Sequence, residues 1–307
     1  MTTNTTTIEL FIANQQSETT ARIYGFELRR YADWLKAERK VSKPERASLA
    51  DVLAYRQRLV DQLAPASAAR CVSTIRAFHK WAVVAGLAKS DPAAAVKPPR
   101  IPRDREPEHL STDEVRRLLA AVDSSARHAK RDWAMLMTLA YTGIRVSELC
   151  NLDIGDVITR KDKALAAIRV RGESAKGSKE RVIPLADPAH RAILSYLEER
   201  DDAGKDVPLF VCRSADDDDR RLSIRAFQWL FARYSERAGI DEAKRHPHIL
   251  RHSAAMRWLY ESRAPGGLFT VSKLLGHSSV STTQVYLSAD RQAQEQAVIG
   301  DPLNLAA

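Results

Sequence analysis

Three prolines lie within five residues of one another near position 100, in the segment 97–103, whose sequence is KPPRIPR. A proline has no backbone N–H to donate, and it disfavours helical conformation in the residue before it, so this segment must be extended. The chain on either side has apolar residues at helical spacing. The sequence therefore predicts two folded parts, residues 1–97 and residues 110–307, joined by an extended basic linker over 98–109.

The part before the linker has the pattern of a small helical bundle. Its apolar side chains recur at steps of three and four residues, which is the spacing of one face of a helix. In the first predicted helix these residues are Tyr24, Leu28, Tyr31 and Leu35. A capping box of Ser48 and Asp51 begins the next helix, and Pro65 suits the first turn of a third. Together with a short helical piece over 91–96, this predicts about four helices.

The part after the linker combines helices with a few strands. Acidic residues follow Thr112 at the start of one helix, and a second helix runs from Arg131 and stops at Gly143. Short β-type runs at 168–170 and 181–183 flank a glycine-rich turn, which predicts a hairpin. We expect further helices over 188–200, 223–238, 247–261, 270–275 and 281–287. The predicted fold class is mainly α with a small β-hairpin or sheet.

The distribution of charge makes a polyanionic partner worth considering. The chain has 48 Lys and Arg against 39 Asp and Glu, a formal charge of +9. Most of the excess lies in residues 1–97, which hold 15 basic and 9 acidic residues. Arg76 and Lys80 are four residues apart, so they share a helix face and can point toward one partner. A well-solvated helical domain explains the charge equally well when it is taken alone.

The cysteines and the N-terminus indicate the compartment. Cys71, Cys150 and Cys212 are widely spaced and form no CxxC pair, so buried thiols in a reducing compartment fit better than a disulfide framework or a zinc site. The first residues, MTTNTTT, lack the basic-then-apolar pattern of a signal peptide, and no apolar run approaches membrane-spanning length. We therefore expect a soluble, cytoplasmic protein with no membrane partner.

Four separated segments in the second part contain polar residues that a core or a plain surface explains poorly. They are 142–148 with Arg145 and Glu148, the turn with Lys176, His248 with Arg251 and His252, and Leu275-Gly276-His277 with Tyr286 nine residues later. Each has an ordinary explanation when taken alone, such as a local ion pair, a solvated turn or a helix stop. A metal site is disfavoured because the HExxH pattern is absent and no third ligand is evident beside His248 and His252.

Taken together and in this order, these residues resemble the catalytic domain of the tyrosine recombinases, the phage-integrase and Xer-type family. The resemblance covers nearly the whole chain, since the first part resembles that family's core-binding domain and the second its α+β catalytic domain. It implies six catalytic residues: Arg145, Lys176, His248, Arg251, His277 and Tyr286. Glu148 occupies the acidic position that steadies the first arginine. Lys176 is preferred to Lys179 because it precedes Gly177 in the family's Lys-Gly-x-Lys-x-Arg pattern.

The chemistry of a phosphodiester explains why these residue types suit its cleavage. Transesterification adds charge to the non-bridging oxygens, and two guanidiniums offer planar pairs of donors to them. His248 shares a helix face with Arg251 and can act as base for Tyr286, because a phenol has a reference pKa of about 10. The resemblance implies a 3′-phosphotyrosyl link, with Lys176 as the general acid for the 5′-oxygen. Since the covalent link conserves the bond energy, rejoining needs no ATP, metal or cofactor.

The resemblance also implies the partners. The substrate is double-stranded DNA with inverted-repeat half-sites, and two domains joined by an extended linker can close around a duplex. The candidate DNA-binding residues, which would contact phosphates or a groove, are Arg76, Lys80, Arg100, Arg103 and Arg105. The apolar residues after Tyr286 would dock on a neighbouring protomer in a homo- or hetero-tetramer. Packing of this tail on its own domain is the alternative.

The sequence thus predicts an enzyme, a site-specific DNA recombinase of integration, excision or dimer resolution. A type IB topoisomerase uses similar Arg, Lys, His and Tyr groups, but the helical first part and the Leu-Gly-His motif favour a recombinase. A non-catalytic DNA-binding regulator would satisfy the charge and the helices, but it would not need all six catalytic-type residues. The target sequence, and the choice between chromosome-dimer resolution and movement of a mobile element, stay open.

Overall fold

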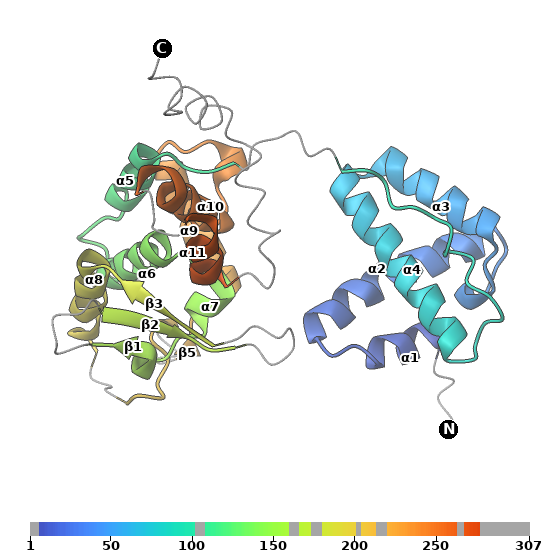
Figure 1. Cartoon of the computed structure of the whole chain (residues 1–307), viewed down its shortest axis with the longest axis horizontal. Helices are drawn as coiled ribbons and strands as arrows, with labels where there is room; N and C mark the ends of the chain where they lie inside the picture. The colour runs from blue at the N-terminus through green and yellow to red at the C-terminus, as the bar shows by residue number, and fades with distance from the viewer. Residues whose placement is uncertain are drawn as a thin grey trace, which may run out of the picture. The chain divides into compact units, whose positions relative to one another are not determined.

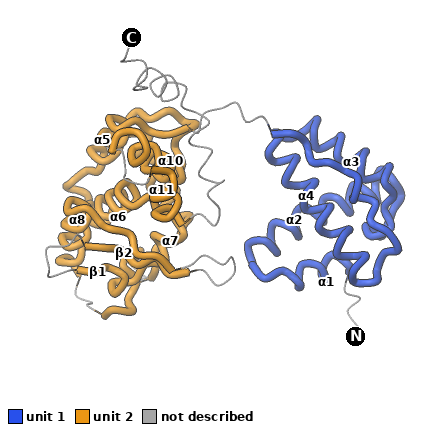
Figure 2. Tube along the Cα trace, in the orientation of Figure 1, with its two compact units in different colours: residues 1–104 blue, residues 105–307 orange. Residues whose placement is uncertain are grey.

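The computed structural model describes residues 6–101, 108–159, 166–172, 180–200, 204–212, 220–262 and 267–276. The chain divides into two compact units, residues 1–104 and residues 105–307 (Figure 2). Each unit has an apolar core built from its own residues. Within 97–101, which contains Pro98 and Pro99, the backbone forms neither helix nor strand, because prolines cannot donate the hydrogen bonds of either.

The first unit is a bundle of helices around an apolar core (Figure 1). Its elements are α1 (Thr7–Ala13), α2 (Glu18–Glu38), the 3-10 turn η1 (Pro44–Arg46), α3 (Leu49–Gln62) and α4 (Pro65–Val84). The predicted apolar face of α2 is its buried face, with Leu28 and Tyr31 entirely shielded from solvent. Ser48 and Asp51 form the predicted capping box at the start of α3, and Pro65 opens α4.

The bundle contains four α-helices among its described residues, but one of them differs from the prediction. Residues 91–96 form a turn instead of a helix, because the prolines that follow leave too few residues for helical hydrogen bonds. Within this turn the Asp91 carboxylate accepts a backbone hydrogen bond. The helix that completes the bundle is α1, which begins with a capping box of Thr6 and Glu9. Phe11 of α1 packs against aromatic rings of α4 at centroid distances of 5.3 and 5.7 Å, which joins α1 to the core.

The second unit consists mainly of helices packed around α6. Its helical elements are α5 (Thr112–Ala120), α6 (Ala129–Thr142), α7 (Val146–Cys150), η2 (Ile154–Asp156), α8 (Asp187–Leu197), α9 (Ile224–Arg237), η3 (Glu242–Lys244), α10 (His248–Met256), the π-helical turn η4 (Arg257–Glu261) and α11 (Gly267–Leu275). Helix α6 is buried on nearly every side and packs against α8 and α10. Its C-terminal end therefore leads from the centre of the core toward α10, where several of the candidate residues lie.

Two small antiparallel sheets complete the second unit (Figure 1). The first has the order β1-β2-β3, from β1 (Val157–Ile158), β2 (Ala166–Val170) and β3 (Arg181–Leu185), and the second pairs β4 (Val211–Cys212) with β5 (Arg220–Arg221). Val170 pairs with Arg181 at the open end of the β2–β3 ladder. The predicted strands of the hairpin are confirmed, whereas residues 173–179 of its turn lie outside the described residues. The fold class, mostly helical with small antiparallel sheets, is confirmed.

Three helical segments of this unit differ from the prediction. The helix predicted over 247–261 changes to a π-helical turn at Arg257, whose guanidinium donates to the carbonyl of Ala140. The helix predicted over 270–275 begins earlier, at Gly267. Helix α7 was not predicted, because five residues are too few to show a helical period. The helix predicted over 281–287 lies outside the described residues.

The cysteines are free thiols, and the predicted burial holds for two of them. Cys71 and Cys150 are buried and Cys212 is half-buried. Burial raises the pKa of Cys71 and that of Cys150 to about 11. Within the part of the chain that the structure describes, no helix combines the length and the apolar character needed to cross a membrane.

Candidate active site

Gly143 ends α6 and directs the chain toward the first candidate arginine. It adopts the left-handed conformation with φ of +57°, which favours glycine. A side chain there would also lack room, since a Cβ atom would lie 3.2 Å from side-chain atoms of Ala254 and Leu275. This close packing of the α6 end against α10 and α11 places Arg145 two residues later, at the N-cap of α7.

Arg145 and Glu148 are held together at the start of α7. The backbone N–H of Arg145 donates to Glu148 Oε2 at 2.8 Å, and Arg145 Nη1 donates to Glu148 Oε1 at 2.9 Å. The Glu148 side chain is only 4% exposed, whereas that of Arg145 is 40% exposed. Glu148 thus fixes the guanidinium from its buried side, and the side of Arg145 that faces solvent stays open to an anion.

A second arginine shares the same carboxylate. Arg181, the first residue of β3, donates through Nη1 and Nη2 to the two oxygens of Glu148 at 3.0 and 2.8 Å. Burial alone would raise the pKa of Glu148, but the hydrogen bonds and charges of Arg181 and Arg145 outweigh it and hold the pKa below its usual value. Arg181 was not among the residues predicted for the site. The available signal was the last arginine of the Lys-Gly-x-Lys-x-Arg pattern.

Arg251 connects the segment after α6 with the end of α11. Its Nη1 donates to the carbonyl of Gly143 at 2.8 Å and its Nη2 to the carbonyl of Leu275 at 2.6 Å. Arg181 reaches the neighbouring carbonyl of Leu274 at 3.2 Å. The fold therefore brings Arg251 to the same place as Arg145 and Glu148, which lie about a hundred residues earlier in the sequence, with Arg181 between the segments.

Gly276 closes this group of contacts. It has a φ of +69°, and a Cβ atom there would lie only 2.8 Å from the guanidinium of Arg181. Glycine is thus needed both for the backbone conformation and for the flat contact with Arg181. Packing against Arg181 therefore explains why the Leu-Gly-His motif has a glycine at this position. His277, the next residue, lies outside the described residues.

His248 is exposed at the N-terminal end of α10, one helical turn before Arg251. Partial desolvation lowers the pKa of His248, and the positive charges of Arg251, His246 and Arg145 lower it further. The neutral imidazole is therefore the favoured form at neutral pH. The centroid of its ring lies 4.6 Å from that of His252, in an edge-to-face arrangement. Over the described residues, no three His, Cys, Asp or Glu side chains form a group that could hold a metal ion.

The remaining candidate residues divide into described and undescribed ones. Arg76 and Lys80 are exposed on α4, as a shared outer face requires, and Arg100 is exposed in the segment after it. Lys176, Tyr286, Arg103 and Arg105, like His277, lie outside the described residues.

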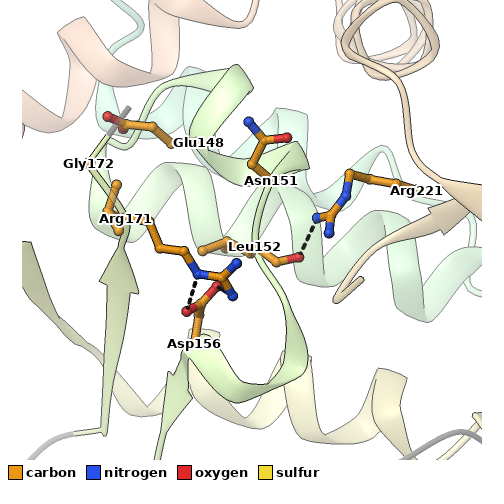
Figure 3. Close-up of a pocket in the computed structure, with 8 residues that line it drawn as sticks. Glu148, Asn151, Leu152, Asp156, Arg171, Gly172 and Arg221 are labelled. Atoms are coloured by element: carbon orange, nitrogen blue, oxygen red, sulfur yellow. Dashed lines mark hydrogen bonds and ion pairs between the residues drawn. The ribbon is translucent and has the colours of Figure 1, made fainter. Parts of the chain in front are cut away.

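A cluster of ion pairs that the sequence analysis did not identify lies beside Glu148, around a pocket of about 310 Å³ (Figure 3). Arg171, directly after β2, donates to both oxygens of Asp156 and lies 2.6 Å from Asp153 Oδ2. Arg221 of β5 contacts the other oxygen of Asp153 at 2.5 Å. Glu148 and Arg171 both line this pocket. No period or motif marks these pairs, because their partners lie between 15 and 68 residues apart.

Comparison with known sequences identifies the class of protein that this fold and site belong to. The phage integrase family matches residues 108–293, and the phage integrase N-terminal SAM-like domain matches residues 7–86. The chain belongs to the phage integrase family. It is an enzyme of DNA recombination, a tyrosine-type site-specific recombinase.

Within this family, the chain is similar to the Xer recombinases. It is 38% identical over 258 residues to tyrosine recombinase XerD of Xanthomonas axonopodis pv. citri (strain 306), which covers 81% of this chain and 79% of the relative. It is 34% identical over 295 residues to tyrosine recombinase XerA of Thermococcus kodakarensis, which covers 94% of this chain and 92% of that one.

Solved structures share the fold. The crystal structure of XerH recombinase bound to its difH substrate matches with a TM-score of 0.70 at 20% identity, over 91% of this chain and 79% of that one. A lambda integrase dimer bound to a core site matches with a TM-score of 0.67 at 19% identity, over 93% and 76% of the two chains. A crystal structure of XerA recombinase, 28% identical, matches with a TM-score of 0.51 over 96% of each chain.

Proposed function

We propose that this recombinase cuts and rejoins DNA through a covalent 3′-phosphotyrosyl intermediate, with Tyr286 as the nucleophile and with no requirement for metal or ATP. The observation that supports the proposal is the convergence of Arg145, Arg181 and Arg251 around Glu148 and the end of α11. A concentration of guanidiniums at one place, with one of them facing solvent, suits an anionic phosphodiester.

In this mechanism Arg145 and Arg251 stabilise the negative charge that develops on the non-bridging oxygens. Arg145 has the exposed side that a phosphate needs, and Glu148 prevents it from turning away. Arg251 is fixed by two carbonyl groups, so its guanidinium requires little reorganisation during the reaction. His277 is the proposed additional hydrogen-bond donor to the phosphate.

His248 is the proposed general base. Its lowered pKa keeps the imidazole neutral at neutral pH, so it can accept the proton of the Tyr286 phenol. The phenol oxygen then bonds to phosphorus while the bond from phosphorus to the 5′-oxygen breaks. Lys176 gives a proton to that leaving oxygen and yields a free 5′-hydroxyl. Attack by the 5′-hydroxyl of a second strand reverses the sequence and completes strand exchange.

The proposed substrate is duplex DNA with inverted-repeat half-sites, in the cytoplasm. XerH was solved with its difH substrate and lambda integrase as a tetramer on a Holliday junction, which supports an assembly of the same kind. We propose residues 1–97 as the core-binding domain, 98–109 as the linker and 110–307 as the catalytic domain. The tail after Tyr286 would join protomers into a homo- or hetero-tetramer.

The experiment that tests this function is trapping of the covalent adduct on nicked half-site DNA, from which the cleaved fragment diffuses away. We expect wild-type protein to form the adduct with and without EDTA, and Tyr286→Phe to bind the DNA but form none. Tyr141→Phe is the matched control, because Tyr141 is a half-exposed tyrosine at the end of α6 with no proposed role. An adduct formed by Tyr286→Phe would contradict the proposed chemistry, and so would loss of the wild-type adduct in EDTA.

A further inference from the structure

Both arms of the β2–β3 hairpin end in an arginine that is bound to the same short segment, residues 145–156. Arg171 follows β2 directly, and Arg181 begins β3, so the two arginines flank residues 172–180. Val170 and Arg181 form the last pair of the ladder, which means that the two arms are still joined where the arginines lie. The hairpin is therefore held by side chains at the point where its strands stop pairing.

On the β2 side, Arg171 forms ion pairs with two aspartates. Arg171 Nε donates to Asp156 Oδ1 at 3.1 Å and Nη2 to Asp156 Oδ2 at 2.7 Å, in a two-pronged arrangement (Figure 3). The same Nη2 lies 2.6 Å from Asp153 Oδ2. The Asp156 and Asp153 side chains are only 2% and 7% exposed. Arg171 itself is 52% exposed, so its guanidinium reaches inward from the hairpin to two buried carboxylates.

The two carboxylates are themselves fixed in place. The backbone N–H of Asp153 donates to Asp156 Oδ2 at 2.9 Å, which closes the turn η2. Arg221 contacts Asp153 Oδ1 at 2.5 Å and also donates to the carbonyls of Cys150 and Leu152. Arg171 therefore contacts a rigid acceptor, not a mobile surface side chain.

The contact on the β3 side joins the same segment to the reaction site. Arg181 donates to both oxygens of Glu148, which also holds Arg145. The β3 arm of the hairpin is thus bound to Glu148, which also orients Arg145. The β2 arm is bound to the turn η2. Residues 172–180 contain Lys176, the proposed general acid.

We propose that Arg171 is a positioning residue that, through Asp156 and Asp153, holds the hairpin in the register that lets Lys176 protonate the leaving 5′-oxygen. The inference rests on the proposed function. Arg181 fixes the β3 arm through Glu148, and Arg171 fixes the β2 arm through Asp156, so a side chain holds each arm of the hairpin. Arg171 acts through the hairpin and is not itself required to touch DNA.

The test compares two leaving groups in single-turnover cleavage. In one half-site DNA the scissile 5′-oxygen is kept, and in the other it is replaced by sulfur. A thiol has a reference pKa of about 8.5, so a thiolate leaves without a proton, whereas an alkoxide does not. We expect Arg171→Ala to cleave the oxygen substrate at least about tenfold more slowly than wild type, but the sulfur substrate within about threefold of the wild-type rate.

Three further variants sharpen the result. Lys176→Ala should show the same rescue by sulfur, to a larger extent. Arg171→Lys keeps the charge but cannot donate to two carboxylates from a planar fork, so we expect a smaller loss than for Arg171→Ala. Arg169→Ala is the matched control: it removes an arginine from the same strand whose ion pair, with exposed Glu180, does not reach residues 145–156. Its two cleavage rates should equal those of wild type.

The ratio of the oxygen rate to the sulfur rate does not depend on the fraction of folded enzyme, so partial unfolding of a variant cannot imitate the expected pattern. Equal losses on both substrates, or no loss on oxygen, would overturn the role of Arg171. If the wild type forms no adduct, the proposed function itself is wrong. If sulfur fails to rescue Lys176→Ala, the general-acid role of Lys176 is wrong, and the inference about Arg171 fails with it. Rescue of Lys176→Ala without rescue of Arg171→Ala overturns the present inference alone.

Discussion

At the scale of single residues, Glu148 accepts hydrogen bonds from two arginines while its carboxylate is almost completely buried. Such a group is costly to bury and is retained only because its partners compensate for the lost hydration. One carboxylate thereby orients the partly exposed Arg145 and the largely shielded Arg181 together. Stability and the geometry of the site depend on the same side chain.

Replacing this carboxylate by an amide should therefore change stability in a pH-dependent way. The folded-state pKa of Glu148 lies below the ordinary value of 4.5, so its contribution is present above pH 4.5 and is lost as the pH falls through the folded-state pKa. We expect Glu148→Gln to lower the free energy of unfolding at pH 7 by about 2 to 4 kcal/mol, and the difference from wild type to shrink as the pH falls below 4.5 and through the folded-state pKa.

Denaturant unfolding of both proteins at a series of pH values measures this difference. Glu198→Gln is the control, because Glu198 is exposed at the end of α8 and should give little change at any pH. A difference between Glu148→Gln and wild type that stays constant down to acid pH would show that the ion pairs are not its source.

The sequence allows some of these residues to be predicted and not others, for a physical reason. Arg145 and Glu148 lie three apart at a helix start, so their contact follows from local geometry. Arg181 and Arg171 acquire their role only when a strand and a turn meet across 15 to 33 residues. Pairing at such distances leaves no periodic trace. Arg181 had a motif that could have identified it, whereas Arg171 had none.

At the scale of elements, the end of α11 is defined by a glycine against which a guanidinium packs. Gly276→Ala should cost the strain of a positive φ and, in addition, the contact of a Cβ atom with Arg181. We expect a loss of about 2 to 3 kcal/mol in the free energy of unfolding, together with slower cleavage because Arg181 must move.

Gly239→Ala provides a matched control within the same unit. Gly239 has a similar φ of +66°, but a Cβ atom there would meet nothing within 4 Å. Thermal unfolding should therefore show a loss of about 1 kcal/mol for this variant, with cleavage unchanged. Equal losses in the two variants would mean that the contact with Arg181 adds nothing to the cost of the backbone strain.

Element prediction succeeded where the apolar period was long and failed where the element was short. The faces of α2, α3 and α4 follow directly from residues spaced three and four apart, such as Leu28 and Tyr31. Helix α1 has seven residues, too few to show a clear apolar period, and it was not predicted. The turn over 91–96 shows the opposite error, in which a capping residue was present without the length to form a helix.

At the scale of the whole molecule, the first part carries most of the excess positive charge, and Arg76 and Lys80 expose part of it on α4. If both contact phosphates, each should add to the release of counterions on DNA binding. We expect Arg76→Ala and Lys80→Ala each to reduce the slope of log affinity against log salt by about 0.9, with little change in the preferred DNA sequence.

Titration of half-site DNA at several salt concentrations measures these slopes. Lys36→Ala serves as the control, because Lys36 is an exposed lysine on α2 outside the proposed contact set. Unchanged slopes for Arg76→Ala and Lys80→Ala would remove this face of α4 from the DNA interface, without bearing on the chemistry of the second unit.

The two carbonyls that hold Arg251 have a consequence for a chain that is still being synthesised. One belongs to a residue 108 positions earlier, and the other to a residue 24 positions later. Until Leu275 has emerged from the ribosome, a nascent copy lacks one of the two supports of this guanidinium. This guanidinium therefore gains its second support only once translation has passed α11, and a product that ended before Leu275 would lack that hydrogen bond.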